Sequence, residues 1–399
     1  MGPKPSAYNV TARVSPEKYI VFNTLTKAAI EVPHDSYVDL FSSSEHESVL
    51  YDLGFLTYPD EESASLARHF AEEASSQNLS LTWHVTRKCN FACSYCFQSE
   101  HYSDKHVSTG KLSGWVLRRL ESMKSKTLSL TLFGGEPLLE IERIVHFIDD
   151  LNSYEISLQA CIVTNGWFLT PPIVRMLVDL GISRFEVTLD GYGKCHDRRR
   201  PTVEGAGTYE RVFENVISAL DKMSGTLRIN WDERNINSIS RLIKEIASQT
   251  SNTDRLTLDF HYVFYNRFIT DTTHVDRIYH KIMEPLRLAK EYGLRIQNPL
   301  SCRLCYGRRP SALVVDELGR LFKCNLMVEA PEMSLGTIDE FQVSSAVSNL
   351  PLLVSSCSSC PYFPLCGGGC LFAARQGFGS GCRKSEFENA KCFILPFCY

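Results

Sequence analysis

Hydrophobic positions between residues 79 and 294 alternate between two kinds of pattern. Six short apolar runs have the length and composition of buried strands, and they lie near residues 79–85, 128–133, 157–163, 184–189, 226–231 and 255–263. Amphipathic helical patterns follow these runs, for example from Thr208 to Met223 and from Ser238 to Ser248. The alternation predicts an α/β fold built from βαβ units around a parallel sheet. Six repeats are fewer than the eight of a closed barrel, so we expect a partial (β/α)6 barrel.

The first 78 residues show a different pattern. Short β-like pieces occur at Tyr19–Phe22 and Ala28–Val32, and a helical stretch covers Tyr37 to Leu53. A polar, acidic segment from Asp60 to Asn78 reads as a linker. We therefore divide the chain into a small α+β domain with its linker (1–78), the barrel (79–295) and a cysteine-rich module (296–399).

Charge and hydropathy narrow the choice of partners. The 399 residues carry a formal net charge of -4, which gives no reason to expect nucleic acid or an anionic membrane as a partner. No window of 18 apolar residues occurs, and Met1 to Val10 lacks the apolar core of a signal peptide. We expect a cytoplasmic protein whose thiols stay reduced and available to metal.

The 15 cysteines are unevenly distributed, with none before Cys89 and ten after residue 300. Cys89, Cys93 and Cys96 form a C-x3-C-x2-C loop directly after the first predicted strand. A 4Fe–4S cluster is normally held by four thiolates, so a loop with three leaves one iron free for another ligand.

Further polar motifs follow the next strands. Gly134-Gly135-Glu136-Pro137 comes after the second, Thr164-Asn165-Gly166 after the third, and Thr188-Leu189-Asp190-Gly191 after the fourth. Ligands of open parallel sheets and α/β barrels bind at the carboxyl ends of the strands. All these motifs are therefore expected at one mouth of the barrel.

The cysteine loop and the Gly-Gly-Glu-Pro motif together resemble the radical S-adenosylmethionine (SAM) enzymes. The resemblance implies that Cys89, Cys93 and Cys96 hold the catalytic cluster and that SAM chelates its fourth iron. It also implies a set of SAM contacts: the backbone of Tyr95 near the adenine, Gly134, Gly135 and Glu136 at the methionine amine, and Thr188 and Arg200 near the ribose and carboxylate.

Several of these residues also have ordinary structural interpretations. Arg198, Arg199 and Arg200 could form a solvated basic loop, and Asp190-Gly191 could be a turn that ends a strand. Cys161 is expected to be a small buried hydrophobic residue. His84 is expected to be a satisfied core histidine, and Phe260 to Tyr265 are expected to line the barrel.

The C-terminal cysteines resemble the SPASM extension of radical SAM enzymes, which binds two auxiliary 4Fe–4S clusters. Cys357, Cys360, Cys366 and Cys370 have its spacing, and Gly319-x4-Cys324 lies on a predicted hairpin that turns at Leu318-Gly319. The resemblance assigns one cluster to Cys302, Cys305, Cys324 and Cys370. It assigns the other to Cys357, Cys360, Cys366 and a later cysteine, for which we favour Cys382 over Cys392 and Cys398.

Two features of this module leave its metal content open. Cys302 and Cys305 lie closer together than is usual for their pair, so the first auxiliary cluster could have only three protein ligands. Structural zinc is the alternative for the whole module, since Cys-x2-Cys pairs also build tetrahedral zinc sites.

The implied reaction is reductive cleavage of SAM to a 5′-deoxyadenosyl radical, which takes a hydrogen atom from a peptide or protein. An external donor such as flavodoxin or ferredoxin would supply the electron. Peptide maturases commonly carry an N-terminal domain that captures a precursor peptide as an added strand, and Tyr19 to Val32 would supply the edge.

Two other functions remain as alternatives. Sulfatase-maturing enzymes, which form formylglycine, carry an aspartate base immediately after the Gly-x4-Cys motif. Here that residue is Asn325, which cannot accept a proton at neutral pH, so the peptide maturase is preferred. The alternative from another class is a noncatalytic iron–sulfur or zinc scaffold.

Overall fold

A nine-stranded, mostly parallel sheet forms the centre of the molecule. The computed structural model describes residues 2–74, 78–98, 105–263, 280–300, 304–340, 357, 359–376 and 381–398. Six successive parallel strands carry the barrel: β6 (Leu79–Thr86), β7 (Thr127–Gly134), β8 (Ser157–Thr164), β9 (Ile182–Thr188), β10 (Ser224–Trp231) and β11 (Leu256–Tyr262). All six predicted strands are confirmed within two residues at each end, and with them the predicted α/β partial barrel.

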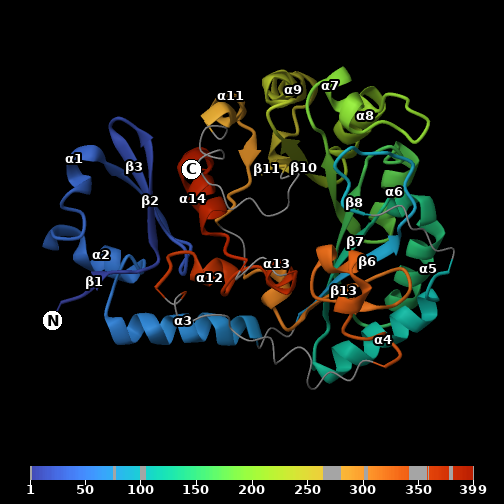
Figure 1. The fold of residues 1–399 in the computed structure, drawn as a ribbon, viewed down its shortest axis with the longest axis horizontal. Coiled ribbons are helices and arrows are strands. Elements are labelled where there is room, and N and C mark those ends of the chain that lie inside the picture. Colours follow the sequence, from blue (N-terminus) through green and yellow to red (C-terminus); the bar gives the residue numbers. More distant parts are fainter. Residues whose placement is uncertain are drawn as a thin grey trace.

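Helices cover the outer face of this sheet (Figure 1). They are α4 (Thr109–Ser122), α5 (Ile141–Asn152), α6 (Pro171–Asp179), α8 (Tyr209–Ala219), α9 (Ile236–Gln249) and α11 (Met283–Glu291). Alternate strand residues such as Leu128, Leu130 and Leu132 face these helices and are fully buried. The residues between them face the inside of the barrel and are more polar and partly exposed, for example Arg228 and Asp259.

The cysteine-rich module continues the barrel sheet. β13 (Ala312–Val315) pairs parallel with β6, and β14 (Leu321–Phe322) pairs antiparallel with β13. This confirms the predicted hairpin, which turns at Gly319 with a φ of 82° that favours glycine. β12 (Arg295–Ile296) extends the other end of the sheet. The sheet thus crosses residue 295, where we placed a domain boundary.

The N-terminal domain contains a three-stranded antiparallel sheet in the order β2 (Asn9–Ser15), β3 (Lys18–Asn23) and β4 (Ala29–Pro33). A second, two-stranded sheet pairs β1 (Lys4–Pro5) with β5 (Leu56–Thr57). The predicted helix from Tyr37 to Leu53 is interrupted and consists of α1 (His34–Tyr37) and α2 (Glu47–Asp52) with a short 3-10 turn between them. We expected the segment from Tyr19 to Val32 to supply a sheet edge, and its second strand, β4, does so, whereas its first strand, β3, is the central strand.

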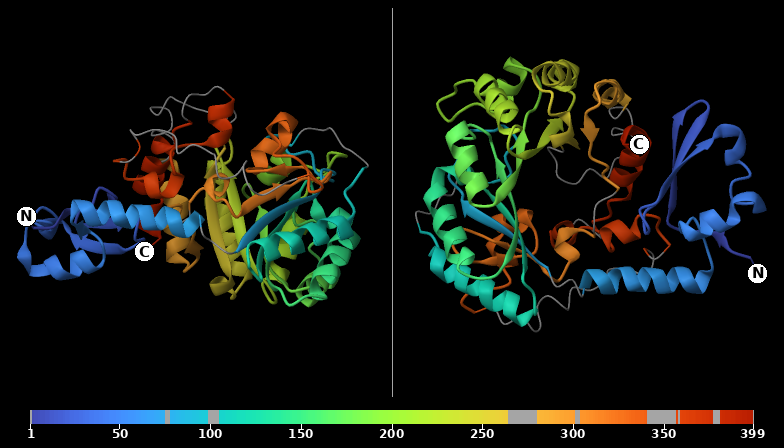
Figure 2. Two further views of the ribbon diagram at one scale, coloured as in Figure 1. Left: turned by 90° about the horizontal axis from the view of Figure 1, so that it is seen from below. Right: turned by 180° about the vertical axis from the view of Figure 1, so that it is seen from behind.

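The predicted linker is largely a helix, α3 (Pro59–Ala74), which runs from the N-terminal domain toward the barrel (Figures 1 and 2). Proline at its first position and three acidic residues in its first turn both favour helix initiation there.

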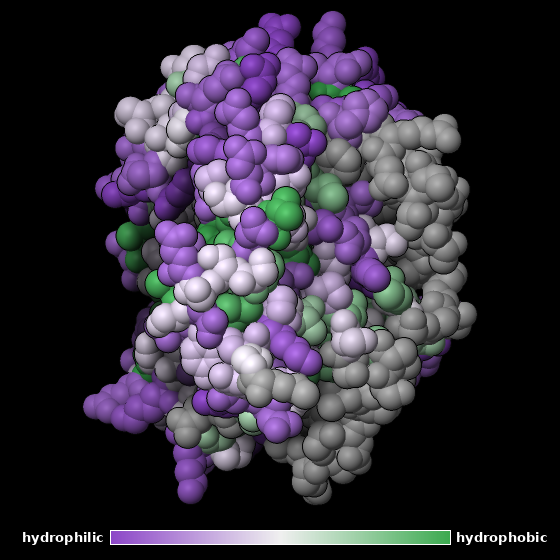
Figure 3. Space-filling view, turned by 90° about the vertical axis from the view of Figure 1, so that its left-hand side faces the viewer, coloured by the Kyte–Doolittle hydropathy of each residue, from purple (hydrophilic) through white to green (hydrophobic). Residues whose placement is uncertain are grey.

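The N-terminal sheet lies against the C-terminal module, which separates it from the barrel (Figure 2). Val10 and Phe22 share a buried cluster with Tyr362, Leu365 and Phe387, which lie on or beside α12 (Phe363–Cys366) and α14 (Lys384–Phe393). The outward face of the N-terminal domain is mostly hydrophilic, with small hydrophobic groups between polar ones (Figure 3). No helix in the described ranges is both long and apolar enough to cross a bilayer.

Candidate active site

The cysteine loop extends from the carboxyl end of β6 and is fixed by backbone hydrogen bonds to the end of α7 (Lys194–Arg199) and the residues that follow it. The amides of Ala92 and Ser94 donate to the carbonyls of Pro201 and Arg199, both at 2.9 Å. Within the loop, the amide of Cys96 donates to the carbonyl of Cys93 at 3.1 Å. A loop of three thiols is thereby anchored to a second part of the barrel mouth.

The Gly-Gly-Glu-Pro motif lies directly against the start of this loop. The amides of Gly135 and Glu136 donate to the carbonyls of Thr86 and Lys88 at 2.9 and 2.8 Å. A Cβ atom on Gly134 would lie 2.2 Å from the Thr86 oxygen, and one on Gly135 would lie 2.3 Å from the Lys88 oxygen. The glycines are therefore required for contact between two strand ends, a role the sequence did not indicate.

Glu136 links the second strand end to the third. Its fully buried carboxylate accepts hydrogen bonds from the Thr164 hydroxyl at 2.8 Å, the Asn165 amide at 2.7 Å and the Leu138 amide at 3.0 Å. Burial raises the pKa of Glu136 to about 7, while these hydrogen bonds act in the opposite direction. The side chain of Asn165 in turn donates to the Cys89 sulfur at 3.8 Å. The predicted contact of Glu136 with SAM stays a prediction.

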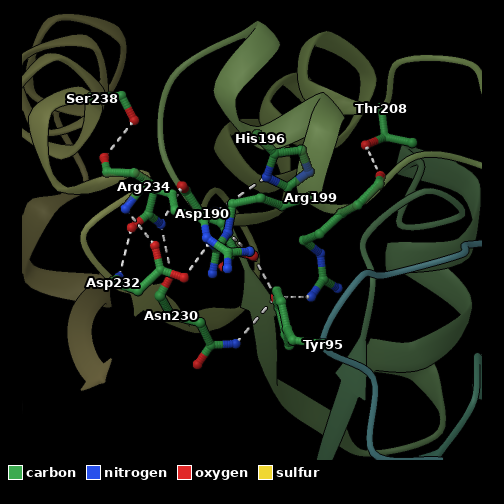
Figure 4. Close-up of polar contacts among 11 residues, drawn as sticks. Tyr95, Asp190, His196, Arg199, Thr208, Asn230, Asp232, Arg234 and Ser238 are labelled. Carbon is green, nitrogen blue, oxygen red and sulfur yellow. Dashed lines mark hydrogen bonds and ion pairs between the residues drawn. The ribbon is translucent and has the colours of Figure 1, made fainter. Parts of the chain in front are cut away.

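The side chain of Tyr95 connects the cysteine loop to β9 and β10 (Figure 4). Its hydroxyl donates to the Asp190 carboxylate and accepts from Arg200 Nη1 at 2.8 Å and Asn230 Nδ2 at 3.3 Å. The sequence predicted a role for the Tyr95 backbone only. The hydroxyl adds a direct link between the loop and Arg200.

The interpretation of Arg198–Arg200 as a solvated loop is wrong for two of its three residues. Arg199 and Arg200 are only 6% and 8% exposed. Arg199 pairs with Asp232 at 2.7 Å and with Asp190 at 3.4 Å, so Asp190 is not a simple surface turn. Burial raises the pKa of Cys93, whereas the Arg200 guanidinium lowers it, which places Arg200 beside a predicted cluster ligand.

A line of charged groups lies on the inner face of the barrel, and the ion pairs within it were not predicted from the sequence. Arg228 on β10 pairs with Glu186 on β9 at 3.1 Å and with Asp259 on β11 at 3.0 Å. His261 Nε2 lies 2.9 Å from Asp259 Oδ2. Polar residues at every second position of otherwise apolar strands were the available signal. Thr188, a predicted SAM contact, is the last residue of β9 and the register partner of Arg228.

Three other sequence interpretations can be compared with their positions. His84 is 1% exposed, and its Nε2 lies 3.2 Å from the Asn325 side-chain oxygen, which confirms a satisfied core histidine. Cys161 is partly exposed on the inner side of β8 rather than fully buried. Phe260 is buried, whereas residues 264 and 265 of the aromatic stretch lie outside the described residues.

The C-terminal cysteines gather in two places. Cys357, Cys360, Cys366 and Cys382 line one pocket together with Gly368 and Gly369. Cys324 interacts electrostatically with Cys305 and Cys370, while Cys302 lies outside the described residues. These two groups match the two predicted ligand sets, including the choice of Cys382, but ligation itself stays a prediction.

The predicted cluster ligands are all thiols. Thiolates are the protein ligands of 4Fe–4S clusters, so the donor sets fit such clusters. Burial raises the pKa of Cys89 and of Cys324 to about 11, and a bound metal would favour the thiolate form of both. Zinc sites made of four thiolates use the same donors, so structural zinc stays the alternative for the C-terminal module.

Residues 83–246 match the model of the radical SAM superfamily. This part of the chain is a radical SAM domain. The radical SAM cyclopropyl synthase TigE of Paramaledivibacter caminithermalis is 23% identical over 236 residues, which are 53% of this chain and 49% of that protein. The GTP 3′,8-cyclase of Campylobacter fetus is 31% identical over 114 residues, which are 28% of this chain and 34% of that protein. The chain thus spans half or less of these curated relatives.

Two solved structures of SPASM-type radical SAM enzymes share the fold. The sulfatase maturase anSMEcpe with bound AdoMet and the Kp18Cys peptide has a TM-score of 0.57 at 16% identity, covering 78% of this chain and 98% of that one. Streptococcus suis SuiB bound to precursor peptide SuiA has a TM-score of 0.53 at 13% identity, covering 94% of this chain and 97% of that one.

Proposed function

We propose that this chain is a radical SAM peptide maturase, which oxidatively modifies or crosslinks a ribosomally made peptide. The observation that carries the proposal is the N-terminal sheet domain held against the cysteine-rich module beside a radical SAM barrel. The likeness to SuiB, solved with a precursor peptide, extends over 94% of the chain, whereas the likeness to anSMEcpe covers 78%. The difference is similar in size to the N-terminal domain.

The free edge of the N-terminal sheet offers a binding mode for the precursor. β2 contacts α14, whereas β4 is the opposite edge of the sheet. A peptide that adds as a strand gains backbone hydrogen bonds and needs no large apolar patch. The mostly hydrophilic outer face in Figure 3 is compatible with this mode.

The barrel mouth would hold the cofactors that radical SAM enzymes use. When bound, the cluster and SAM supply the 5′-deoxyadenosyl radical that takes a hydrogen atom from the peptide. Cys89, Cys93 and Cys96 would ligate the cluster, and Arg200 would bind the SAM carboxylate through its guanidinium. Tyr95 orients Arg200, and Glu136 with Asn165 fixes the position of the cysteine loop.

The C-terminal cysteines would hold the two auxiliary clusters, and flavodoxin or ferredoxin would reduce the enzyme in the cytoplasm. Formylglycine formation in a sulfatase is the second candidate, favoured by the likeness of the barrel to anSMEcpe. Asn325 counts against it, because it follows Cys324 where an aspartate base would be needed and its side-chain oxygen faces His84.

Anaerobic co-expression with each short peptide encoded beside the gene tests the proposal. A maturase removes two hydrogen atoms from the peptide as a bond forms, which mass spectrometry detects. A formylglycine-forming enzyme that acts on cysteine removes two hydrogen atoms and also replaces the sulfur by oxygen, so it lowers the peptide mass by more than the two hydrogens. The Cys93→Ala variant is the matched control, and peptides that leave wild type and variant unchanged in mass would overturn the proposal.

A further inference from the structure

His261 occupies the inner face of β11 near the SAM site. It is the register partner of Asn230 on β10, so the two side chains point to the same face of neighbouring parallel strands. Asn230 donates to the hydroxyl of Tyr95 on the cysteine loop at 3.3 Å. His261 is therefore one strand away from a residue that contacts the loop.

Asp259 orients His261. The Asp259 Oδ2 atom accepts from Arg228 Nη2 at 3.0 Å and lies 2.9 Å from His261 Nε2. Because a carboxylate oxygen paired with Arg228 can only accept, the Nε2 atom of His261 donates to it, and Nδ1 of the neutral ring presents a lone pair. The His261 side chain is 48% exposed, whereas that of Asp259 is 14% exposed.

His261 also interacts with the cysteine-rich module. Glu386 on α14 lies close enough to interact electrostatically with His261, and it pairs with Arg383 at 2.5 Å. Arg383 in turn interacts with Cys305 and Cys370. His261 is thus linked through Asn230 to the cysteine loop and through Glu386 and Arg383 to one predicted auxiliary site.

From this placement we infer that His261 is the base that takes a proton from the substrate, in the role for which Asn325 is unsuited. The inference rests on the proposed function. After the substrate loses a hydrogen atom, an electron leaves it for an iron–sulfur oxidant and a proton passes from its X–H group to His261 Nδ1. The resulting imidazolium is stabilised by Asp259 and Glu386, while the Arg228 guanidinium pairs with both Asp259 and Glu186. The proton then passes to water on the exposed side of the ring.

Two other histidines of the described barrel, His84 and His196, are less suited to this role. His84 is 1% exposed and its Nε2 faces Asn325. His196 is fully buried, and its Nδ1 already accepts the amide hydrogen of Asp190 at 3.2 Å.

Chemical modification tests the placement without a substrate. Diethyl pyrocarbonate is applied to the reconstituted enzyme, and modified histidines are mapped by peptide mass spectrometry. His34 is a matched reference because its side chain is 49% exposed and it also pairs with a carboxylate. We expect His261 to react at a rate within about threefold of His34, because reactivity requires an accessible, unprotonated nitrogen. His84 and His196 should resist, and a His261 that resists as they do would overturn the inference.

A His261→Gln variant tests the chemical role with the co-expressed peptides. We expect 5′-deoxyadenosine to form as in wild type, while product formation falls about 100-fold, the usual effect of losing a general base. His46→Gln, an exposed histidine of the N-terminal domain, is the control. Added imidazole should restore product formation in His261→Ala, which a purely structural role would not allow.

The two hypotheses fail in different ways. If wild type makes 5′-deoxyadenosine but His261→Gln yields as much product as wild type, the base assignment falls and the maturase stands. If wild type modifies no peptide, the maturase proposal falls and takes the substrate role of His261 with it.

Discussion

The loop of Cys89, Cys93 and Cys96 begins at the end of a central strand, whereas the described cysteines from Cys305 onward lie on turns and on helices of ten residues or fewer. The first loop is bonded to three neighbouring strand ends through Gly135, Glu136 and Tyr95. In the second region, Gly367, Gly368 and Gly369 turn the chain between Cys366 and Cys370 with positive φ angles of 62°, 99° and 100°.

This difference indicates which parts of the protein stabilise each site. The first site is held by the barrel alone, so substitutions in the barrel should be sufficient to disturb it. The second depends on packing from outside, since Thr24 donates to the Pro361 carbonyl and His69 Nε2 lies 3.0 Å from the Pro364 carbonyl oxygen. We expect changes in the N-terminal domain to affect the second site more than the first.

The largest effect is expected from Gly134→Ala. Its Cβ would lie 2.2 Å from the Thr86 oxygen at a φ of 132°, so both a clash and backbone strain oppose it. We expect a loss of at least about 3 kcal/mol of unfolding free energy in urea titrations. Gly181→Ala is the control, because its φ is 81° but the space around it is open, and it should cost about 1 kcal/mol. Equal losses would contradict the proposed contact between strand ends.

Tyr95→Phe should come next. It removes the hydroxyl that connects the cysteine loop to Asp190, Arg200 and Asn230, and hydrogen bonds to charged groups contribute about 1.5–3 kcal/mol each. We expect SAM affinity, measured by equilibrium dialysis, to fall about tenfold, while iron bound by the C-terminal cysteines stays unchanged. Unchanged SAM affinity would show that the hydroxyl does not orient Arg200.

His84 lies where the two regions meet, because it is on β6 and its ring contacts Asn325, the residue after Cys324. Its protonation therefore tests the contact between the regions. Burial lowers its pKa to about 4, so the unfolded chain binds a proton more readily than the folded chain between pH 4 and the ordinary value of 6.5. Stability from this group is therefore present at pH 7 and decreases as the pH falls. Wild type should lose about 2 kcal/mol more than His84→Gln between pH 7 and pH 5. Parallel stability curves for the two proteins would contradict this.

The smallest effect is expected from Thr24→Val, which removes one hydrogen bond to the Cys360–Cys366 segment and should cost about 1 kcal/mol. On mild heating, the Thr24→Val variant should lose iron from its C-terminal module earlier than wild type does. The absorbance of an iron chelator measures this loss. Thr57→Val, whose hydroxyl contacts only the next residue, is the control. Equal iron loss from both variants would show that this contact with the N-terminal domain does not stabilise the second site.

The sequence predicted the parts of the fold that depend on local patterns. Leu128–Phe133 and its equivalents are apolar runs, so the barrel strands could be located within two residues of their ends. The parallel pairing of β13 with β6 could not be predicted, because Ala312 and Ser80 are brought together only by the complete chain. The carboxylates that pair with Arg199 could not be predicted either, because Asp190 and Asp232 lie at the ends of other strands. Three consecutive arginines without visible partners resemble a solvated loop.

The measurement that tests the account most directly is SAM cleavage by anaerobically reconstituted protein under strong reductant. Wild type should produce 5′-deoxyadenosine, and the variant with Cys89, Cys93 and Cys96 all changed to Ala should produce none while it keeps about two thirds of the iron, as expected if two of three 4Fe–4S clusters remain. Equal 5′-deoxyadenosine from the two proteins, or none from wild type, would contradict a catalytic cluster on this loop.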